Sequence, residues 1–162
     1  MGPAHVPGIE VMLEDADVRR NTRVPSEPPP GFAETWVARY EEGWQDGTRA
    51  GFAIEAHDGE FLGLGMVIDI DWEGQQAEIG YVLSPAARGR GAATRTVKLL
   101  TDWCFEQLGF VRLELWIDVT NPASERVAER AGYLKEGVLR STWFKEDIRI
   151  DVGVWSQLRT DR

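Results

Sequence analysis

The chain has very little cysteine and histidine, with one cysteine and two histidines in 162 residues. A single cysteine excludes an internal disulfide framework and fits a reducing compartment, so we expect a cytoplasmic protein. Cys104 falls on the apolar side of a predicted helix, which indicates a buried structural thiol. His5 and His57 have no Cys or His clustered with them, so we expect no metal site.

Long apolar runs and an excess of positive charge are also missing. No run approaches the length of a membrane span and no signal peptide is evident, so we expect no membrane partner. The net charge is -9, which argues against general nucleic-acid binding, because neutralising phosphates requires a basic surface. The 43% apolar and 28% charged residues are ordinary for a globular protein, and the length fits one domain.

Acidic residues are absent from one stretch of this acidic chain. Residues 79–101 contain no Asp or Glu, but they include Arg88, Arg90, Arg95 and Lys98. A solvated helix face would normally mix both signs. The stretch holds a glycine-rich turn, Arg88 to Ala93, between an apolar run and a predicted helix. Such a turn leaves backbone N–H groups unpaired where the helix dipole adds positive charge, which predicts a site for a phosphate-sized anion.

Two familiar phosphate loops do not fit this turn. A nucleotide P-loop would end in Gly-Lys-Ser/Thr, and a dinucleotide fingerprint beginning at Gly89 would need a third glycine where Thr94 stands. The turn instead resembles the acetyl-CoA pyrophosphate loop of the GNAT N-acetyltransferase superfamily. The signature of that loop, Arg/Gln-x-x-Gly-x-Gly/Ala after a strand, is matched by Arg88, Gly91 and Ala93.

Further segments carry the same resemblance in the same order along the chain. Asn121–Tyr133 resembles the next block of the superfamily. Glu78–Tyr81 and Glu136–Arg140 are similar to its RimJ/RimL-like branch, the ribosomal-protein N-terminal acetyltransferases. The resemblance covers residues 50–156. It implies an α/β fold of the GNAT-like acyl-CoA N-acyltransferase type, in which a central, mostly antiparallel mixed sheet has a parallel pair splayed around CoA and is flanked by helices.

Hydrophobic periodicity and turn residues predict the order of the elements. We expect strands over 51–56, 61–70, 75–83 and 111–119, helices over 32–44 and 91–108, a helix capped by Asn121 and ended by Gly132, and a final hairpin. A crossover helix between 75–83 and 111–119 implies that these two strands pair in parallel. Residues 24–31 hold four prolines and must be a loop.

The N-terminal region departs from the usual pattern of the superfamily. Residues 1–8 are expected to be disordered or an expression-vector remnant, and residues 9–162 to form the single GNAT domain. Ile9, Val11 and Leu13 fit a remnant strand, whereas Glu10 to Arg20 fits a short helix. Because the first helices of the superfamily usually line the acceptor side, this departure concerns the amine site most.

The resemblance implies acetyl transfer from acetyl-CoA, a co-substrate, to a primary amine by direct transfer in a ternary complex. The positions that it assigns to CoA are Tyr81, Val82, Leu83, Arg88, Gly89, Arg90, Gly91, Ala92, Ala93, Asn121, Ser124 and Arg126. A backbone N–H near Val82 or Leu83 would stabilise the thioester oxygen. Asn121 also fits a simple helix cap, and Arg126 also fits a solvated helix residue.

Glu78 and Ser124 are the predicted catalytic residues. Glu78 matches an acidic position of the RimJ/RimL-like branch and is the candidate base, although it also fits a partner for a neighbouring cation. The superfamily's usual tyrosine acid is replaced here by Ala128. Ser124 is the substitute candidate, with a purely hydrogen-bonding role as its alternative. Trp36, Trp72 and Trp143 fit either an acceptor groove or ordinary packing.

The acceptor is expected to be a protein or peptide N-terminal α-amine. A peptide α-amine has a pKa near 8 and a lysine near 10.4, so the α-amine needs much less help to lose its proton. Two alternatives stay open: a small-molecule amine, either a polyamine or an aminoglycoside-like compound, and a catalytically weak CoA-binding sensor domain. Either a monomer or a homodimer is compatible with the sequence.

Overall fold

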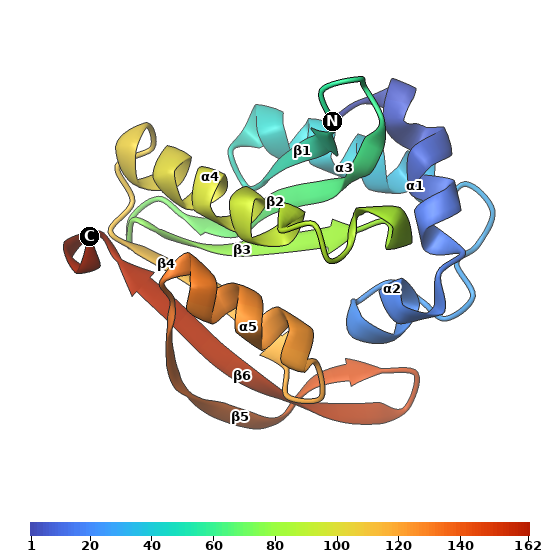
Figure 1. Ribbon diagram of the computed structural model, residues 1–162. Helices are drawn as coiled ribbons and strands as arrows, with labels where there is room; N and C mark the ends of the chain where they lie inside the picture. The colour runs from blue at the N-terminus through green and yellow to red at the C-terminus, as the bar shows by residue number, and fades with distance from the viewer.

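The computed structural model describes all 162 residues and contains one mixed sheet. Its helices are α1 (Val6–Leu13), α2 (Ala16–Asn21), α3 (Phe32–Asp46), α4 (Ala92–Glu106) and α5 (Pro122–Ala131). Its strands are β1 (Ala50–Glu55), β2 (Phe61–Asp71), β3 (Gln76–Leu83), β4 (Arg112–Asp118), β5 (Leu134–Lys145) and β6 (Ile148–Leu158). The strand order is β1-β2-β3-β4-β6-β5 (Figure 1). Only β3 and β4 pair in parallel, as the sequence predicts.

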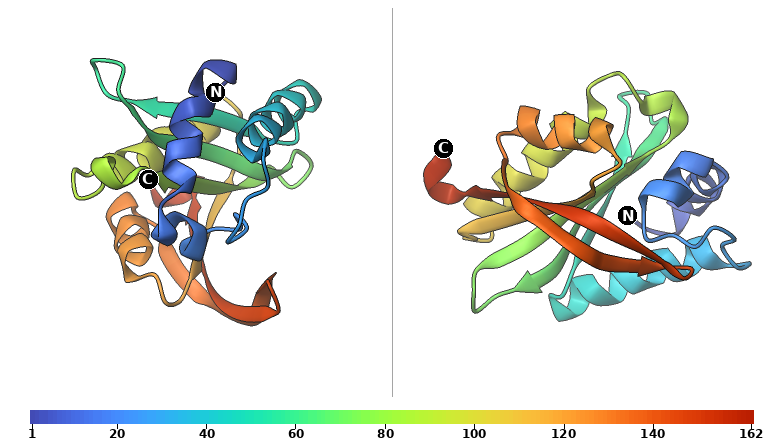
Figure 2. Two further views of the ribbon diagram at one scale, coloured as in Figure 1. Left: turned by 90° about the vertical axis from the view of Figure 1, so that its right-hand side faces the viewer. Right: turned by 90° about the horizontal axis from the view of Figure 1, so that it is seen from below.

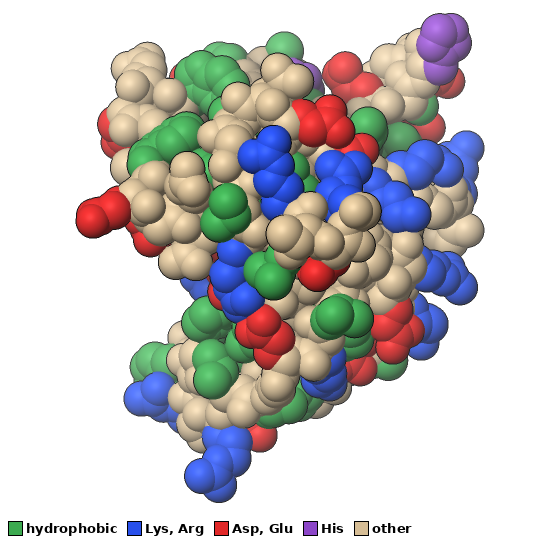
Figure 3. All heavy atoms as spheres, turned by 90° about the vertical axis from the view of Figure 1, so that its left-hand side faces the viewer, with side chains coloured by type: hydrophobic (Ala, Val, Ile, Leu, Met, Phe, Trp, Pro, Cys, Tyr) green, Lys and Arg blue, Asp and Glu red, His purple; other side chains and the backbone are tan.

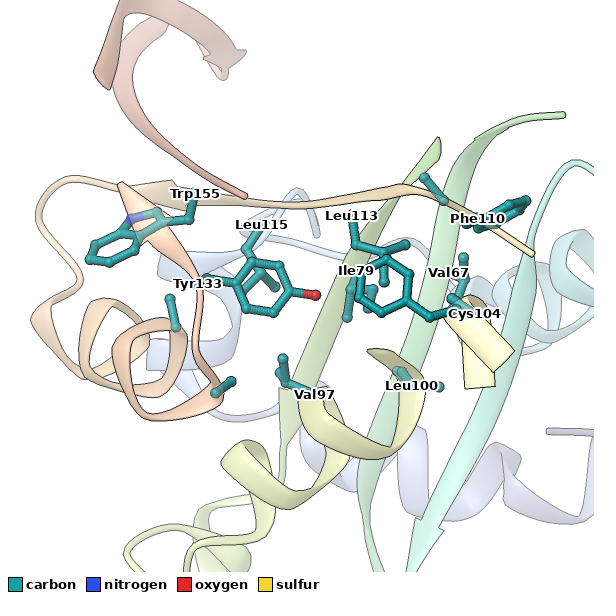
Figure 4. Packing of buried hydrophobic residues seen from close by; sticks show 14 of the residues in the cluster. Val67, Ile79, Val97, Leu100, Cys104, Phe110, Leu113, Leu115, Tyr133 and Trp155 are labelled. Atoms are coloured by element: carbon teal, nitrogen blue, oxygen red, sulfur yellow. The ribbon is translucent and has the colours of Figure 1, made fainter. Parts of the chain in front are cut away.

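The central strands β2 and β3 bury both of their faces against helices, whereas β5 at one edge of the sheet is mostly exposed. Side chains alternate along a strand, so Leu64 and Met66 of β2 pack with α1 and α3, while Val67 joins the core under α4. The right-hand view in Figure 2, seen from below, shows α4 and α5 on one side of the sheet and α1 to α3 on the other. Figure 4 shows Val97 and Leu100 of α4 directed at the sheet side chains of that core. Cys104 is fully buried there, as expected.

The parallel pair separates soon after it forms. Only three residue pairs join β3 to β4, the last of them Glu78 with Glu114. Beyond that pair, β3 continues to Leu83 and β4 to Asp118 without bonding to each other. This opening, called the strand split below, is the predicted splay. It exposes backbone groups of two strand ends in the middle of the sheet, where a ligand can reach them.

Residues 1–8 correct the expectation of disorder. Pro3–His5 form a 3-10 turn that leads into α1 at Val6, and the Met1 amino group donates to the Gly51 carbonyl at 2.7 Å. No remnant strand forms. Apolar residues at helical spacing place Ile9, Met12 and Leu13 on the buried side of α1, and this burial fixes the segment.

A second short helix, α2, follows at once and is capped by Asp15, whose carboxylate accepts from the Val18 N–H at 2.9 Å.

The other elements lie close to their predicted ranges. Helix α4 ends at Glu106, two residues before the predicted end, and Gly109 follows it with φ of 76°. Asn121 caps α5 and Gly132 ends it in the left-handed conformation, as predicted.

The surface carries both signs of charge. Figure 3 shows one face, on which basic and acidic side chains are interspersed with small apolar patches. None of the helices combines the length and apolar character that crossing a bilayer requires. No group of three or more His, Cys, Asp or Glu side chains lies in a metal-binding arrangement.

Candidate active site

The strand split opens into a cavity of about 310 Å³. Its walls come from the separated ends of β3 and β4, the start of α5, the segment that follows α2, and one face of α3. The α3 face presents Phe32, Thr35, Trp36, Arg39 and Tyr40, whose spacing places them on one side of a helix. The cavity therefore lies where strand backbone, a helix N-terminus and aromatic side chains meet.

Glu78 lies on the cavity wall at the point where β3 and β4 separate. Its side chain is 12% exposed, and this burial raises the pKa of Glu78 from 4.5 to about 7. The Arg23 guanidinium, 3.8 Å from the carboxylate, pulls the pKa back down, while Asp69 and Glu114 push it up. A carboxylate with a pKa near 7 is half deprotonated at neutral pH, which suits a general base. Glu78 also fits the predicted alternative role, because it is the ion-pair partner of Arg23.

Tyr81 and Ser124 connect the two sides of the split. The Tyr81 hydroxyl on β3 lies 2.8 Å from the Ser124 hydroxyl on α5. Ser124 is held in turn because its N–H donates to the side chain of Asn121, which caps α5 at 3.1 Å. Burial raises the pKa of Tyr81 to about 12, so the phenol stays protonated and can donate. Two hydroxyl groups thus share one hydrogen bond at the cavity wall.

The backbone of β3 offers donors to the split at alternate residues. The Ser84 N–H donates to the carbonyl of Leu62, the second residue of β2, and Val82 pairs with Leu64 of the same strand. Because N–H direction alternates along a strand, the N–H of Val82 belongs to the ladder with β2, whereas those of Tyr81 and Leu83 point toward the split. Of the two oxyanion donors expected from the sequence, Leu83 is the one whose N–H is free for this purpose.

The glycine-rich turn has the geometry of an anion cradle at the start of α4. Gly89 and Gly91 have φ of 74° and 75°, a conformation that favours glycine, and Gly91 caps α4 without a side-chain bond to its first N–H groups. A Cβ placed on Gly89 would meet no protein atom within 4 Å. No acidic residue lies in the first turn of α4. The first N–H groups of the helix therefore face outward with an unopposed helix dipole, which fits a CoA pyrophosphate.

The basic side chains of this turn do not act alike. Arg88 turns away from the helix start and pairs with Asp15 at 2.5 Å and with Asp17 at 3.5 Å, which ties the turn to α2. This pair lowers the pKa of Asp15. Arg90 is exposed and makes no ion pair, and Arg126 is exposed on α5. The turn and Arg126 lie outside the residues that line the cavity.

The structure thus brings together only part of the predicted set. Glu78, Tyr81, Val82, Asn121 and Ser124 line one cavity. The outcome for the tryptophans is mixed, because Trp36 and Trp143 line it, whereas Trp72 packs against Phe110 and donates to the Gly47 carbonyl. Sequence reasoning missed the arginines of the cavity, Arg23, Arg39 and Arg49. No local motif marks them, since they come from three different segments.

The comparison with known families identifies the class of this protein. Residues 1–134, well over half of the chain, match the family described as an acetyltransferase (GNAT) domain. The chain belongs to this family and is an acetyl-CoA-dependent N-acetyltransferase. The mixed sheet, the splayed parallel pair and the cradle at the start of α4 are consistent with that membership.

Individual relatives differ in the acceptor that their names indicate. The putative ribosomal N-acetyltransferase YdaF of Bacillus subtilis is 28% identical over 146 residues, which cover 90% of this chain and 72% of that protein. The spermidine N(1)-acetyltransferase of Escherichia coli K12 is 31% identical over 105 residues, or 65% of this chain and 56% of that protein. The crystal structure of spermidine N-acetyltransferase from Vibrio cholerae with CoA and spermine superposes with a TM-score of 0.86. At 22% identity, covering 99% of this chain and 94% of that one, it shows the shared fold.

Proposed function

We propose that the protein transfers the acetyl group of acetyl-CoA to the α-amine of a protein or peptide N-terminus within one ternary complex. The observation that carries this proposal is the position and pKa of Glu78. A base of pKa about 7 takes a proton from an α-amine of pKa near 8 at a cost of about 1.4 kcal/mol, but from a lysine of pKa 10.4 at about 4.6 kcal/mol. The site is therefore matched to an α-amine.

Residues on the two sides of the strand split carry out the proton transfers. Glu78 takes the proton from the bound ammonium group, and the neutral nitrogen attacks the thioester carbon. The N–H of Leu83 donates to the oxygen as it becomes negative, a contribution of about 3 kcal/mol for one preorganised donor. When the carbon–sulfur bond breaks, the Ser124 hydroxyl gives its proton to the leaving thiolate, and Tyr81, 2.8 Å away, replaces it. The attacking nitrogen still carries one proton more than the amide needs, and the transfer of this proton through bound water to the Tyr81 phenolate restores the hydroxyl and completes the amide.

The donor is held by groups that are already in place. Acetyl-CoA supplies the activated acetyl thioester. The N–H groups of Gly91, Ala92 and Ala93 bind its pyrophosphate at the start of α4, with added charge from Arg90 and Arg126. Tyr81, Val82 and Leu83 run along the pantetheine arm on one side, and Asn121 and Ser124 meet it on the other.

A small-molecule amine is the second candidate, because relatives of this chain include spermidine N(1)-acetyltransferases. The two candidates differ in what the acceptor cavity must tolerate. A polyamine carries two or more positive charges, whereas a peptide N-terminus carries one beside a polar, neutral backbone. The cavity is lined by three arginines and three carboxylates (Asp69, Glu78 and Asp118), so it lacks the excess of negative charge that would match a polyamine, and this favours the peptide.

The test is thiol release from acetyl-CoA with three acceptors: a short peptide with a free N-terminus, the same peptide with a blocked N-terminus and a free lysine, and spermidine. We expect the free N-terminus to be acetylated fastest and Glu78→Gln to lower its kcat by about 10²- to 10⁴-fold. Faster turnover of spermidine would transfer the assignment to the second candidate. Tight acetyl-CoA binding with no turnover of any amine would leave a CoA-binding domain without this activity.

A further inference from the structure

Two arginines on the α3 side line the cavity. Arg39 lies on the cavity face of α3, and Arg49 follows α3 at the entry to β1. The stem of Arg49 packs where Gly43 has no side chain, and its guanidinium lies 5.7 Å from the ring centroid of Tyr40. Packing therefore holds Arg49 in place without an acidic partner.

Neither guanidinium makes an ion pair within the protein, although hydrogen bonds from Thr48, together with the charge of Arg49, lower the pKa of Asp46. No carboxylate lies within 4.0 Å of Arg39 or Arg49, although the chain has 27 acidic residues against 18 basic ones. In contrast, Arg23 of the same cavity is paired with Glu78. An acidic protein that leaves two arginines unpaired on the wall of its acceptor cavity offers two guanidinium groups to a ligand there.

The cavity has three carboxylates, as many as its arginines, but two of them already have partners. Asp118 is buried and accepts from the N–H and the hydroxyl of Thr120 at 2.7 and 2.8 Å. Asp69 is exposed, and Glu78 is needed as the base and faces Arg23. The two arginines of the α3 side are thus available for an anionic group on the ligand.

We infer that the preferred acceptor is an amine that also carries a carboxylate, with the amine at Glu78 and the carboxylate at Arg39 and Arg49. The inference rests on the proposed N-acetyltransferase function and specifies its substrate. Guanidinium groups bind carboxylates through charge-assisted hydrogen bonds, so this pairing orients the acceptor as well as attracting it. The carboxylate has two sources: the side chain of an acidic first residue of a peptide, or the α-carboxylate of a free amino acid.

Matched acceptors test the inference. Thiol release is measured with a peptide that begins with Glu and its twin that begins with Gln, and with a free amino acid and its amide. We expect kcat/KM to be about 10- to 100-fold higher for the carboxylate member of at least one pair, which identifies the source. Arg39→Gln and Arg49→Gln each reduce that ratio, and the double variant brings it close to one.

The control is Arg130→Gln, which removes an exposed, unpaired arginine from α5, outside the cavity. We expect this variant to show the same ratio of kcat/KM between the carboxylate acceptor and its neutral twin as the wild type. The ratio is informative because a general loss of packing would lower both members of a pair equally. Equal turnover within both pairs, or a preference that survives the double variant, overturns the inference and leaves the proposed function standing. Acetyl-CoA binding with no turnover of any amine would instead overturn the proposed function, and the inference with it.

Discussion

Glu78 sets the acidic limb of the pH–rate profile, and its neighbours determine where that limb lies. With a pKa of about 7, Glu78 is about one tenth deprotonated at pH 6 and nine tenths at pH 8. The kcat for an α-amine acceptor therefore rises about tenfold per pH unit below pH 7 and then levels off. Glu78→Gln removes this limb together with most of the rate.

Two neighbouring charges move the limb in opposite directions. Arg23 lies 3.8 Å from Glu78, and its side chain is 56% exposed, so a water-like interaction of about 1 kcal/mol applies. Removing that charge in Arg23→Gln raises the inflection by about 0.8 pH unit. Asp69→Asn lowers it, because the Asp69 charge raises the pKa of Glu78.

The experiment measures kcat at saturating acetyl-CoA and acceptor from about pH 5.5 to about pH 8.5, which spans the pKa of Glu78. Circular dichroism at each pH shows whether the variants remain folded. If both variants keep the wild-type inflection, or if Glu78→Gln retains the limb, another group takes the proton and the role given to Glu78 is refuted.

Three further predictions concern single side chains. Tyr81→Phe removes the hydrogen-bond partner of Ser124 and lowers kcat by about 2- to 12-fold in the thiol-release assay; an unchanged kcat would remove Tyr81 from the mechanism. Asp15→Asn keeps the helix cap but loses the ion pair with Arg88, which costs up to about 1 kcal/mol of unfolding free energy. Because the folded pKa of Asp15 is lowered, denaturant titration shows this loss above the unfolded pKa of about 4 and a shrinking difference below it. Glu78→Gln raises the free energy of unfolding by about 3 kcal/mol at pH 8 but not at pH 4. The reason is that the pKa of Glu78 is higher in the folded state, so the wild type loses stability as the pH rises from 4.5 to about 7. Equal unfolding free energies of variant and wild type at pH 8 would contradict the raised pKa.

Local patterns explain why much of the architecture was predictable. Alternating side chains define β4, Asn121 and Pro122 define the start of α5, and Gly132 defines its end. A crossover helix between two strands requires a parallel pair. Each of these features depends on residues close together in the sequence, so the sequence alone identifies it.

The N-terminal segment was harder because its glycines and prolines indicate disorder when read locally. Burial of Ile9 and Met12 against the sheet outweighs that preference. Contacts between distant residues were also beyond local reasoning. Arg88 pairs with Asp15, 73 positions away, and nothing near Arg88 indicates that its charge is directed there.

The sequence predicts which residue types take part in the site better than it predicts the contacts between them. The family resemblance points to Glu78 and Ser124, and both line the cavity. Their assigned roles stay predictions. The hydrogen bond between Tyr81 and Ser124 joins residues 43 positions apart, and Arg39 of α3 becomes part of the site only when that helix packs beside the split.

The most direct test of the account is calorimetric titration of acetyl-CoA into the wild type, Gly91→Asp and Gly109→Asp. Both glycines have positive φ, 75° and 76°, so the two variants carry the same strain and the same added charge. Only Gly91→Asp places that charge at the start of α4, where the pyrophosphate is expected. The account predicts one acetyl-CoA per chain for the wild type and Gly109→Asp, and at least about tenfold weaker binding for Gly91→Asp. A folded wild type that binds no acetyl-CoA, or a Gly91→Asp variant that binds it as well as Gly109→Asp does, would contradict it.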